Sequence, residues 1–348
     1  MLAEVHYPEQ LSPEALDAYL QQGWFRMGQT IFTTNFVHFH HQLYSAIWLR
    51  LILSEFTEER TQLKLFKRNA RFRSEIKPAT ITEEKEDLYA HYKESCSFET
   101  SASLRQLLYR GADLTSVYNT YEVAVYDGKQ LIAIGYFDLG GNSAEGITSV
   151  YHPAYKKFSL GKFLIYQKIM YCKQLGLTYF YPGYFVPGYA SFDYKLSIGK
   201  NALEFLQLSS SQWLPLQRFS PASIPINVME EKLEVLRNIL MENNLVSSVL
   251  KYTYFDANLV PELTGTELFD FPIMLLCGIP SDDNKNILVV FDVCDEHYHL
   301  LHCAAIWSTG NLNEEPGFFS THLLKIAEEI LTTPFAEDLL SPIRCLAH

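Results

Sequence analysis

The segment from residue 120 to residue 195 limits the fold more than any other part of the chain, because strand, turn and helix signals follow one another there without interruption. Two runs of strand composition, residues 121–126 and 131–139, flank the turn pair Asp127-Gly128. Alternating or continuous apolar residues on both sides of such a turn are typical of a β-hairpin. The segment therefore begins with two antiparallel strands.

A strand, a helix and another strand are predicted to follow this hairpin. The apolar run at residues 147–151 leads through a loop into residues 160–175, whose apolar spacing indicates a helix. Gly176 ends that helix, and residues 178–181 have strand composition again. This order predicts a mixed sheet with a helix packed on it, within a chain of the α+β class.

The loop before the predicted helix places cations beside a helix N-terminus. Free backbone N–H groups and the helix dipole favour an anion there, most simply a phosphate. We assign the binding of such a phosphate, on a bound ligand, to the residues of this loop and of the first helical turn. They are Lys156, Lys157, Ser159, Leu160, Gly161 and Lys162. The alternative is an ordinary helix N-cap followed by a glycine needed for packing.

The order and spacing of these motifs resemble the arginyl- and leucyl-tRNA–protein transferases, a branch of the GNAT acyltransferases. The motifs are DGKQLIAIGYFDL (127–139), TSVY (148–151), SLG (159–161), LGLTYFYPGY (175–184), SFDYK (191–195) and, upstream, GWFRMGQTIF (23–32). The similarity covers roughly residues 16–216. It implies a GNAT-like mixed sheet with flanking helices, a small N-terminal module and an α+β C-terminal appendage.

The resemblance also implies a reaction and its participants. An amino acid, arginine or otherwise leucine, would pass from aminoacyl-tRNA to the N-terminal amine of acceptor proteins, with acidic N-termini expected and no cofactor. Tyr184, Tyr194 and Lys195 are the candidate catalytic residues, because tyrosine rings stack on a terminal adenine and a lysine holds a phosphate or an acidic acceptor. Glu122 and Asp138 on the hairpin are candidate general bases.

Two other functions fit the same residues. An acetyl-coenzyme A-dependent GNAT enzyme would use the same phosphate loop, and a non-catalytic descendant would only bind. The family's N-terminal cysteine cluster is missing: the interval TTNFVHFHHQLYSAIWLR has none, and Cys96 is the first cysteine in the chain. Three histidines stand in or beside that interval, and a second group includes Cys294 and Cys303. If residues 296–307 are a strand, this second group divides between two faces, so we expect no metal site.

Charge argues against broad nucleic-acid binding, since the net charge is −12 and the isoelectric point is near 5.4. A tRNA-dependent enzyme with this balance must concentrate its cations. We therefore assign tRNA binding to the densest basic run, through Lys67, Arg68, Arg71 and Arg73. The alternative is a solvated face. Cysteines without framework spacing, a polar N-terminus and no apolar run of membrane length favour the cytoplasm.

Three domains are expected from the length and the linker signals: an N-terminal module at 1–75, the transferase domain at 76–217, and an appendage of unknown role at 227–348. Helices are predicted at residues 13–21, 82–95, 229–243 and 320–331. The helix at 82–95 should turn its lysines, from Lys85 to Lys93, toward solvent.

Overall fold

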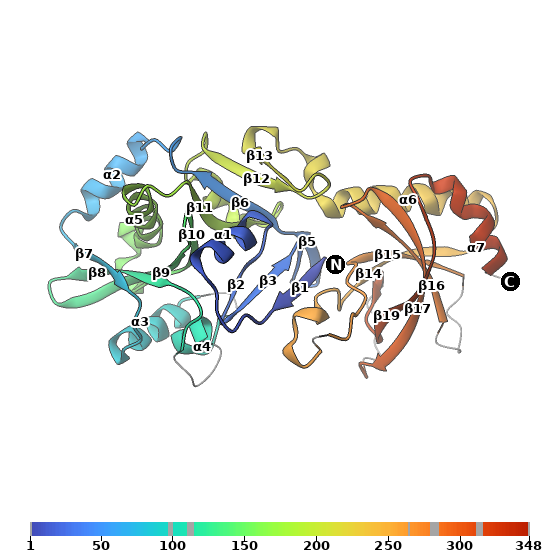
Figure 1. Cartoon of the computed structure of the whole chain (residues 1–348), viewed down its shortest axis with the longest axis horizontal. Coiled ribbons are helices and arrows are strands. Elements are labelled where there is room, and N and C mark those ends of the chain that lie inside the picture. Colours follow the sequence, from blue (N-terminus) through green and yellow to red (C-terminus); the bar gives the residue numbers. More distant parts are fainter. Residues whose placement is uncertain are drawn as a thin grey trace.

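The computed structural model describes residues 2–96, 100–109, 115–263, 265–278, 285–310 and 316–346. Within these ranges it has a mixed α+β fold, as predicted. An eight-stranded sheet and a six-stranded sheet lie apart in the molecule, and short N-terminal strands lie between them (Figure 1). In the same ranges, no helix combines the length and the apolar character needed to cross a bilayer.

The eight-stranded sheet contains the predicted hairpin and the strands that follow it. All neighbouring strands are antiparallel except the central pair β10–β11, which is parallel. In spatial order the strands are β13 (Gln212–Pro215), β12 (Leu203–Gln207), β6 (Ile47–Ile52), β11 (Tyr179–Phe185), β10 (Ser143–Tyr151), β9 (Gln130–Leu139), β8 (Thr120–Asp127) and β7 (Arg73–Pro78). The strand–helix–strand unit β10–α5–β11 is confirmed, with α5 (Leu160–Gln174) beginning directly after Ser159.

Helices cover both faces of this sheet. On one face α5 buries Phe163, Leu164 and Ile169 against the strands, and α2 (Arg60–Asn69) packs beside it. On the other face lie α3 (Glu83–Glu94) and α4 (Leu104–Tyr109). The prediction that Lys85 faces solvent is wrong, since Lys85 is buried and its ammonium lies 2.6 Å from the carboxylate of Glu122 on β8.

The N-terminal module covers the remaining part of that second face. Ser12 caps α1 (Pro13–Gln21) as predicted. A small sheet follows in the order β1 (Ala3–His6), β3 (Thr30–Thr34) and β2 (Phe25–Met27), and then the hairpin of β4 (Phe36–Phe39) and β5 (Gln42–Ser45). The interval without cysteines therefore supplies this hairpin and part of β6.

A buried ion pair fastens this module to the large sheet. One guanidinium nitrogen of Arg26 on β2 lies 2.9 Å and 3.0 Å from the two carboxylate oxygens of Asp138 on β9. The other guanidinium nitrogens donate to the backbone carbonyls of Gly28 and Leu108, and the group lies 4.4 Å from the centre of the Tyr118 ring. Every charged atom of the pair is thus removed from water and has a partner.

The six-stranded sheet forms the C-terminal part of the described chain. Its order is β18 (Phe318–Phe319), β14 (Ser247–Tyr252), β15 (Ile273–Cys277), β16 (Lys285–Asp292), β17 (His297–Ser308) and β19 (His322–Thr333). α6 (Pro225–Glu242) packs along β14, β15 and β16, and α7 (Leu340–Leu346) follows near the C-terminus (Figure 1). The domain limits 1–75, 76–217 and 227–348 stay a prediction.

The helix expected at 320–331 is wrong, because residues 322–331 belong to β19, which pairs antiparallel with β17 along its length. Three register shifts interrupt this pairing and break the strict alternation of buried and exposed residues. At one shift, Leu300 and Leu301 both point into the core. Cys303 is therefore on the buried face of β17, whereas His297 and His299 are on the other face. These bulges explain why the apolar spacing of residues 320–331 predicted a helix instead of a strand.

Removing the Arg26 guanidinium should destabilise the protein strongly. In Arg26→Met the carboxylate of Asp138 stays buried without its cation, and breaking such a pair costs about 3–5 kcal/mol. We expect a much lower urea midpoint than in the parent. Arg237→Ala, which breaks the exposed pair between Arg237 and Glu234, should change the free energy of unfolding by less than about 1 kcal/mol. Equal losses in the two variants would contradict the role given to the buried pair.

Candidate functional site

The central strands β10 and β11 separate in the middle of the sheet. They pair only from Ser143 to Glu145 on one strand and from Tyr179 to Tyr181 on the other, and beyond this point β11 pairs with β6 alone. Two local features explain the separation. Pro182 has no backbone N–H with which to continue the ladder, and a bulge lies between Gly146 and Thr148.

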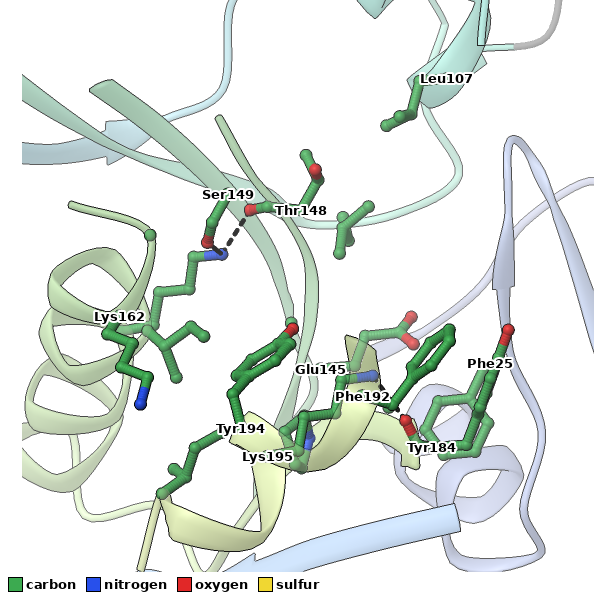
Figure 2. Close-up of a pocket in the computed structure, with 18 of the residues that line it drawn as sticks. Phe25, Leu107, Glu145, Thr148, Ser149, Lys162, Tyr184, Phe192, Tyr194 and Lys195 are labelled. Carbon is green, nitrogen blue, oxygen red and sulfur yellow. Dashed lines mark hydrogen bonds between the residues drawn. The ribbon is translucent and has the colours of Figure 1, made fainter. Parts of the chain in front are cut away.

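A cleft of about 880 Å³ opens at this divergence. Its walls come from β10, β11, the first turns of α5, the 3-10 helix η2 (Ala190–Ser197) and the N-terminal module (Figure 2). Tyr89 and Tyr92 on α3 also border it. Because one wall comes from residues before position 50 and another from residues after position 190, the cleft depends on how these segments pack together.

The predicted phosphate loop reaches the mouth of the cleft. Lys156, Ser159, Gly161 and Lys162 line it, and Lys156 and Lys162 are exposed. Ser159 has φ +55°, a left-handed conformation that joins the 3-10 helix η1 (Pro153–Phe158) to α5, and its side chain makes no capping hydrogen bond. The first amides of α5 therefore remain available to an anion.

The other two members of the predicted loop lie elsewhere. Leu160 is fully buried in the core beneath α5. Lys157 does not line the cleft: its ammonium lies 5.3 Å from the centre of the Phe158 ring, and its carbonyl accepts a hydrogen bond from Arg68 on α2. Two lysines, Lys156 and Lys162, thus line the cleft at the start of α5, and Lys157 lies outside the cleft.

The three predicted catalytic residues all line the cleft. Tyr184 is on β11, and Tyr194 and Lys195 are on η2. The ammonium of Lys195 donates to the backbone carbonyl of Tyr184 at 2.6 Å. Gly183, with φ +85°, leaves room for this ammonium, because a Cβ there would stand 3.2 Å from it. Burial lowers the pKa of Lys195 to about 7.

A second buried lysine supports the cleft from α5. The ammonium of Lys168 donates to the carbonyls of Tyr136 and Thr148, at 2.9 Å and 2.6 Å, and Gly135 leaves room for it. Burial lowers its pKa to about 7. Lys168 thereby holds the carbonyl of Thr148, which closes the bulge in β10, in a fixed direction. Local sequence does not predict this contact, because both acceptors are backbone carbonyls on other elements.

Aromatic rings form the wall opposite α5. Phe25 and Trp48 stack with ring centres 3.6 Å apart, the Tyr184 ring meets Trp48 edge-on at 4.9 Å, and Phe192 stacks on Tyr184 at 5.3 Å. All four residues line the cleft. The wall offers flat apolar surface beside the polar atoms described above.

The cleft also contains a carboxylate that the sequence analysis missed. Glu145 is 3% exposed and stands at the point where β10 leaves β11. Its Oε2 accepts a hydrogen bond from the backbone N–H of Arg26 at 3.3 Å, while its Oε1 has no hydrogen-bond partner among the described residues. Burial, and then the nearby charge of Asp138, raise the pKa of Glu145 to about 8.

The two carboxylates proposed from the sequence as general bases have structural partners instead. Glu122 is held by Lys85, and Asp138 by Arg26 and by the hydroxyl of Thr120. Neither residue lines the cleft. An acidic residue followed by a glycine directly before the apolar run 147–151, as in Glu145-Gly146, was the available signal for the third carboxylate, but only the pairing of the strands shows that the sheet opens there.

The four cations assigned to tRNA are exposed and lie outside the cleft, on and after α2. Arg68 is the link between them and the phosphate loop, since it donates to the carbonyl of Lys157 at 3.1 Å. Arg71 lies 4.0 Å from Asp127, and Arg73 pairs with Glu75. The structure thus places these cations beside η1, the approach to the start of α5.

The histidines considered for a metal do not converge. His40 and His41 are exposed in the turn of the β4–β5 hairpin, and His299 and His302 on β17 lie opposite different residues of β19, Thr332 and Glu328. Among the described residues, one group of possible ligands comes together, formed by Asp292, Asp295 and His299 at the β16–β17 turn. It lies at the surface of the C-terminal sheet, away from the cleft, and two of its members already bind each other.

Comparison with known proteins identifies the cleft-forming region with one family. Residues 84–204 match the family described as "Arginine-tRNA-protein transferase, C terminus". An aspartate/glutamate leucyltransferase of Leptospira interrogans is 32% identical over 202 residues, which are 56% of this chain and 77% of the relative. A Campylobacter jejuni protein of the same name is 24% identical over 213 residues, covering 58% and 84% of the two chains.

Replacing Lys195 should alter how stability depends on pH. An unfolded lysine titrates near pH 10.4, so between about pH 7 and pH 10 the unfolded chain binds a proton that the folded chain does not. Lys195 therefore makes the parent more stable as the pH rises across this window. In Lys195→Met this gain should be smaller when urea midpoints are measured at intervals from pH 7 to 9.5. Lys200→Met, at an exposed neighbour, should keep the parent's dependence; the same dependence in Lys195→Met would rule out the lowered pKa.

Proposed function

Because the chain belongs to the aminoacyl-tRNA–protein transferase family, we propose that it transfers leucine from leucyl-tRNA to the N-terminal amine of proteins that begin with Asp or Glu. The observation that carries this proposal is the cleft itself. It combines an open helix N-terminus and two lysines for phosphate with an aromatic wall for a base or an apolar side chain.

Leucine is favoured over arginine for two reasons. The relatives compared above are named as leucyltransferases, and the cleft is rich in apolar groups such as Phe25, Ile147 and Phe192. A guanidinium needs a carboxylate partner in a buried site. The cleft offers one in Glu145, whose carboxyl group is held in its neutral form up to about pH 8.

An acidic acceptor residue suits the charges at the mouth of the cleft. Lys156 and Lys162 line it and are exposed, so they attract both the phosphates of the donor and the side chain of an N-terminal Asp or Glu. The ester of an aminoacyl-tRNA is already activated, so holding the amine close to the carbonyl carbon supplies much of the rate. Tyr184, Tyr194 and Lys195 are the residues proposed to position the two substrates there.

Acetyl-coenzyme A is the competing donor, because its pyrophosphate would also fit the start of α5. The assay supplies leucyl-tRNA, arginyl-tRNA or acetyl-coenzyme A, each labelled on the acyl group, to peptides beginning with Asp, Glu or Lys. We expect label from leucyl-tRNA on the Asp and Glu peptides and none on the Lys peptide. If only arginine is transferred, the donor is arginyl-tRNA and not leucyl-tRNA. If only the acetyl group is transferred, the protein is an acetyl-coenzyme A-dependent acyltransferase and the proposed reaction is wrong. Tight binding of tRNA without transfer would identify a non-catalytic binding protein.

The cations around α2 should strengthen tRNA binding without entering the cleft. Replacing Lys67, Arg68, Arg71 and Arg73 by Ala should weaken binding and make it less sensitive to salt. Each lost phosphate contact lowers the slope of log affinity against log salt concentration by about 0.7 to 0.9. Fluorescence anisotropy with labelled tRNA at several salt concentrations measures both effects.

A matched control removes cations from the other end of the molecule. Lys232, Arg237 and Arg344 are exposed on α6 and α7, and their replacement by Ala makes the net charge of −12 more negative by three, compared with four for the α2 variant. We expect the slope for this control to equal that of the parent. If both variants flatten the slope alike, the α2 cations act only through overall charge.

A further inference from the structure

Glu145 is a buried carboxylate that the protein's own groups leave partly unsatisfied. Buried polar atoms almost always have hydrogen-bond partners. As an acceptor, the Oε1 atom of Glu145 has none among the described residues, and its Oε2 has the long contact of 3.3 Å from the Arg26 amide. The Asp138 side chain can accept a hydrogen bond from Glu145 only while Glu145 is protonated. A donor supplied by a ligand would complete the group, and Figure 2 shows this side chain pointing into the cleft.

The charged groups around Glu145 explain why no protein cation satisfies it. Asp138 stands directly opposite on β9, and the Arg26 guanidinium is committed to that carboxylate and to two backbone carbonyls. The hydroxyl of Tyr118 donates to the carbonyl of Thr30. Lys195 on η2 also lines the cleft, but its ammonium is directed to the carbonyl of Tyr184. Glu145 is therefore the one carboxylate that lines the cleft among the described residues, and none of these groups forms an ion pair with it.

We propose that Glu145 is the proton acceptor for the attacking N-terminal amine. This proposal rests on the transfer reaction proposed above. The neutral amine attacks the carbonyl carbon of the aminoacyl ester, a C–N bond forms, and the bond from that carbon to the ribose oxygen breaks. Glu145 accepts the proton that the nitrogen loses and returns it to the departing ribose oxygen. The carboxylate is thus regenerated, and no oxidant or further reactant is required.

The position and the acidity of Glu145 suit this role. It stands at the last paired residues of β10 and β11, where the diverging strands admit substrate. A free α-amine titrates near pH 7.7–8.0, and a proton acceptor works best when its own pKa is close to the working pH. Burial and the charge of Asp138 raise the pKa of Glu145 to about 8, which brings it into that range.

The test compares the parent with Glu145→Gln, which keeps the shape of the side chain but cannot accept the proton. At saturating peptide and donor, kcat should fall by about 10²- to 10⁴-fold while KM changes little. The amine of the peptide titrates identically with both enzymes, so the ratio of their kcat values isolates Glu145. This ratio should rise with pH through about 8. Glu94→Gln, at an exposed residue near the end of α3, is the matched control and should retain the parent's kcat.

Chemical rescue separates proton transfer from packing. In Glu145→Ala, formate should restore part of the lost rate in proportion to its concentration, while chloride at equal ionic strength should not. If Glu145→Gln keeps the parent's kcat, or if the ratio of rates is flat with pH, Glu145 is not the proton acceptor. A rise in KM for arginyl-tRNA alone would also overturn the proposal, because it would make Glu145 a binding group for the donor side chain.

Two further outcomes keep the inference apart from the proposed function. A parent that transfers no amino acid from any aminoacyl-tRNA removes the function and the inference together. A parent that transfers leucine, but whose kcat does not rise through about pH 8 at saturating substrates, removes the inference and leaves the function standing. This last measurement needs no variant, so a flat profile overturns the inference even if both substitutions prevent folding.

Discussion

The buried ion pair between Arg26 and Asp138 is the contact on which the geometry of the cleft depends. It joins the three-stranded N-terminal sheet to the eight-stranded sheet, next to the strand that borders the opening. The same residue, Arg26, also donates its backbone N–H to Glu145. Its guanidinium therefore binds the carboxylate of Asp138, while its amide donates to the neighbouring carboxylate of Glu145. Arg26, a residue of the N-terminal module, thus contacts both Asp138 and Glu145 and holds these two carboxylates in place.

The opening itself results from two irregularities in otherwise regular strands. A proline in β11 ends the parallel ladder, and a bulge in β10 turns the other strand away. Such features cost stability unless other groups compensate. Lys168 compensates here, because its ammonium takes up the carbonyl of Thr148 that the bulge would otherwise leave inside the core. The lowered pKa of this lysine reflects the cost of burying its charge.

Local signals predicted the elements of this sheet well, because each was written into a short stretch of sequence. Asp127-Gly128 marked the hairpin, Ser12 the start of α1, and Gly176 the end of α5. The features that were wrong or missing depend on partners far along the chain. Lys85 is buried because Glu122 lies on a strand beneath it, and β19 is a strand because β17 lies beside it. The environment of Glu145 likewise depends on distant partners. Arg26 is 119 residues away in the sequence, and Asp138 lies on the neighbouring strand β9.

The interval that departs from the cysteine pattern of the resembling family has a definite structural use in this chain. Its β4–β5 hairpin contacts both the C-terminal part of the chain and the wall of the cleft. Phe36 packs against Phe255 of the C-terminal part, and the hydroxyl of Ser45 accepts a hydrogen bond from the amide of Ile226 in the first turn of α6. Phe39, at the other end of β4, meets the aromatic wall of the cleft, with its ring 6.1 Å from that of Phe192. Since apolar side chains and backbone pairing stabilise this hairpin, it needs no thiolate cluster to hold its shape, and it connects the C-terminal sheet to the residues that line the cleft.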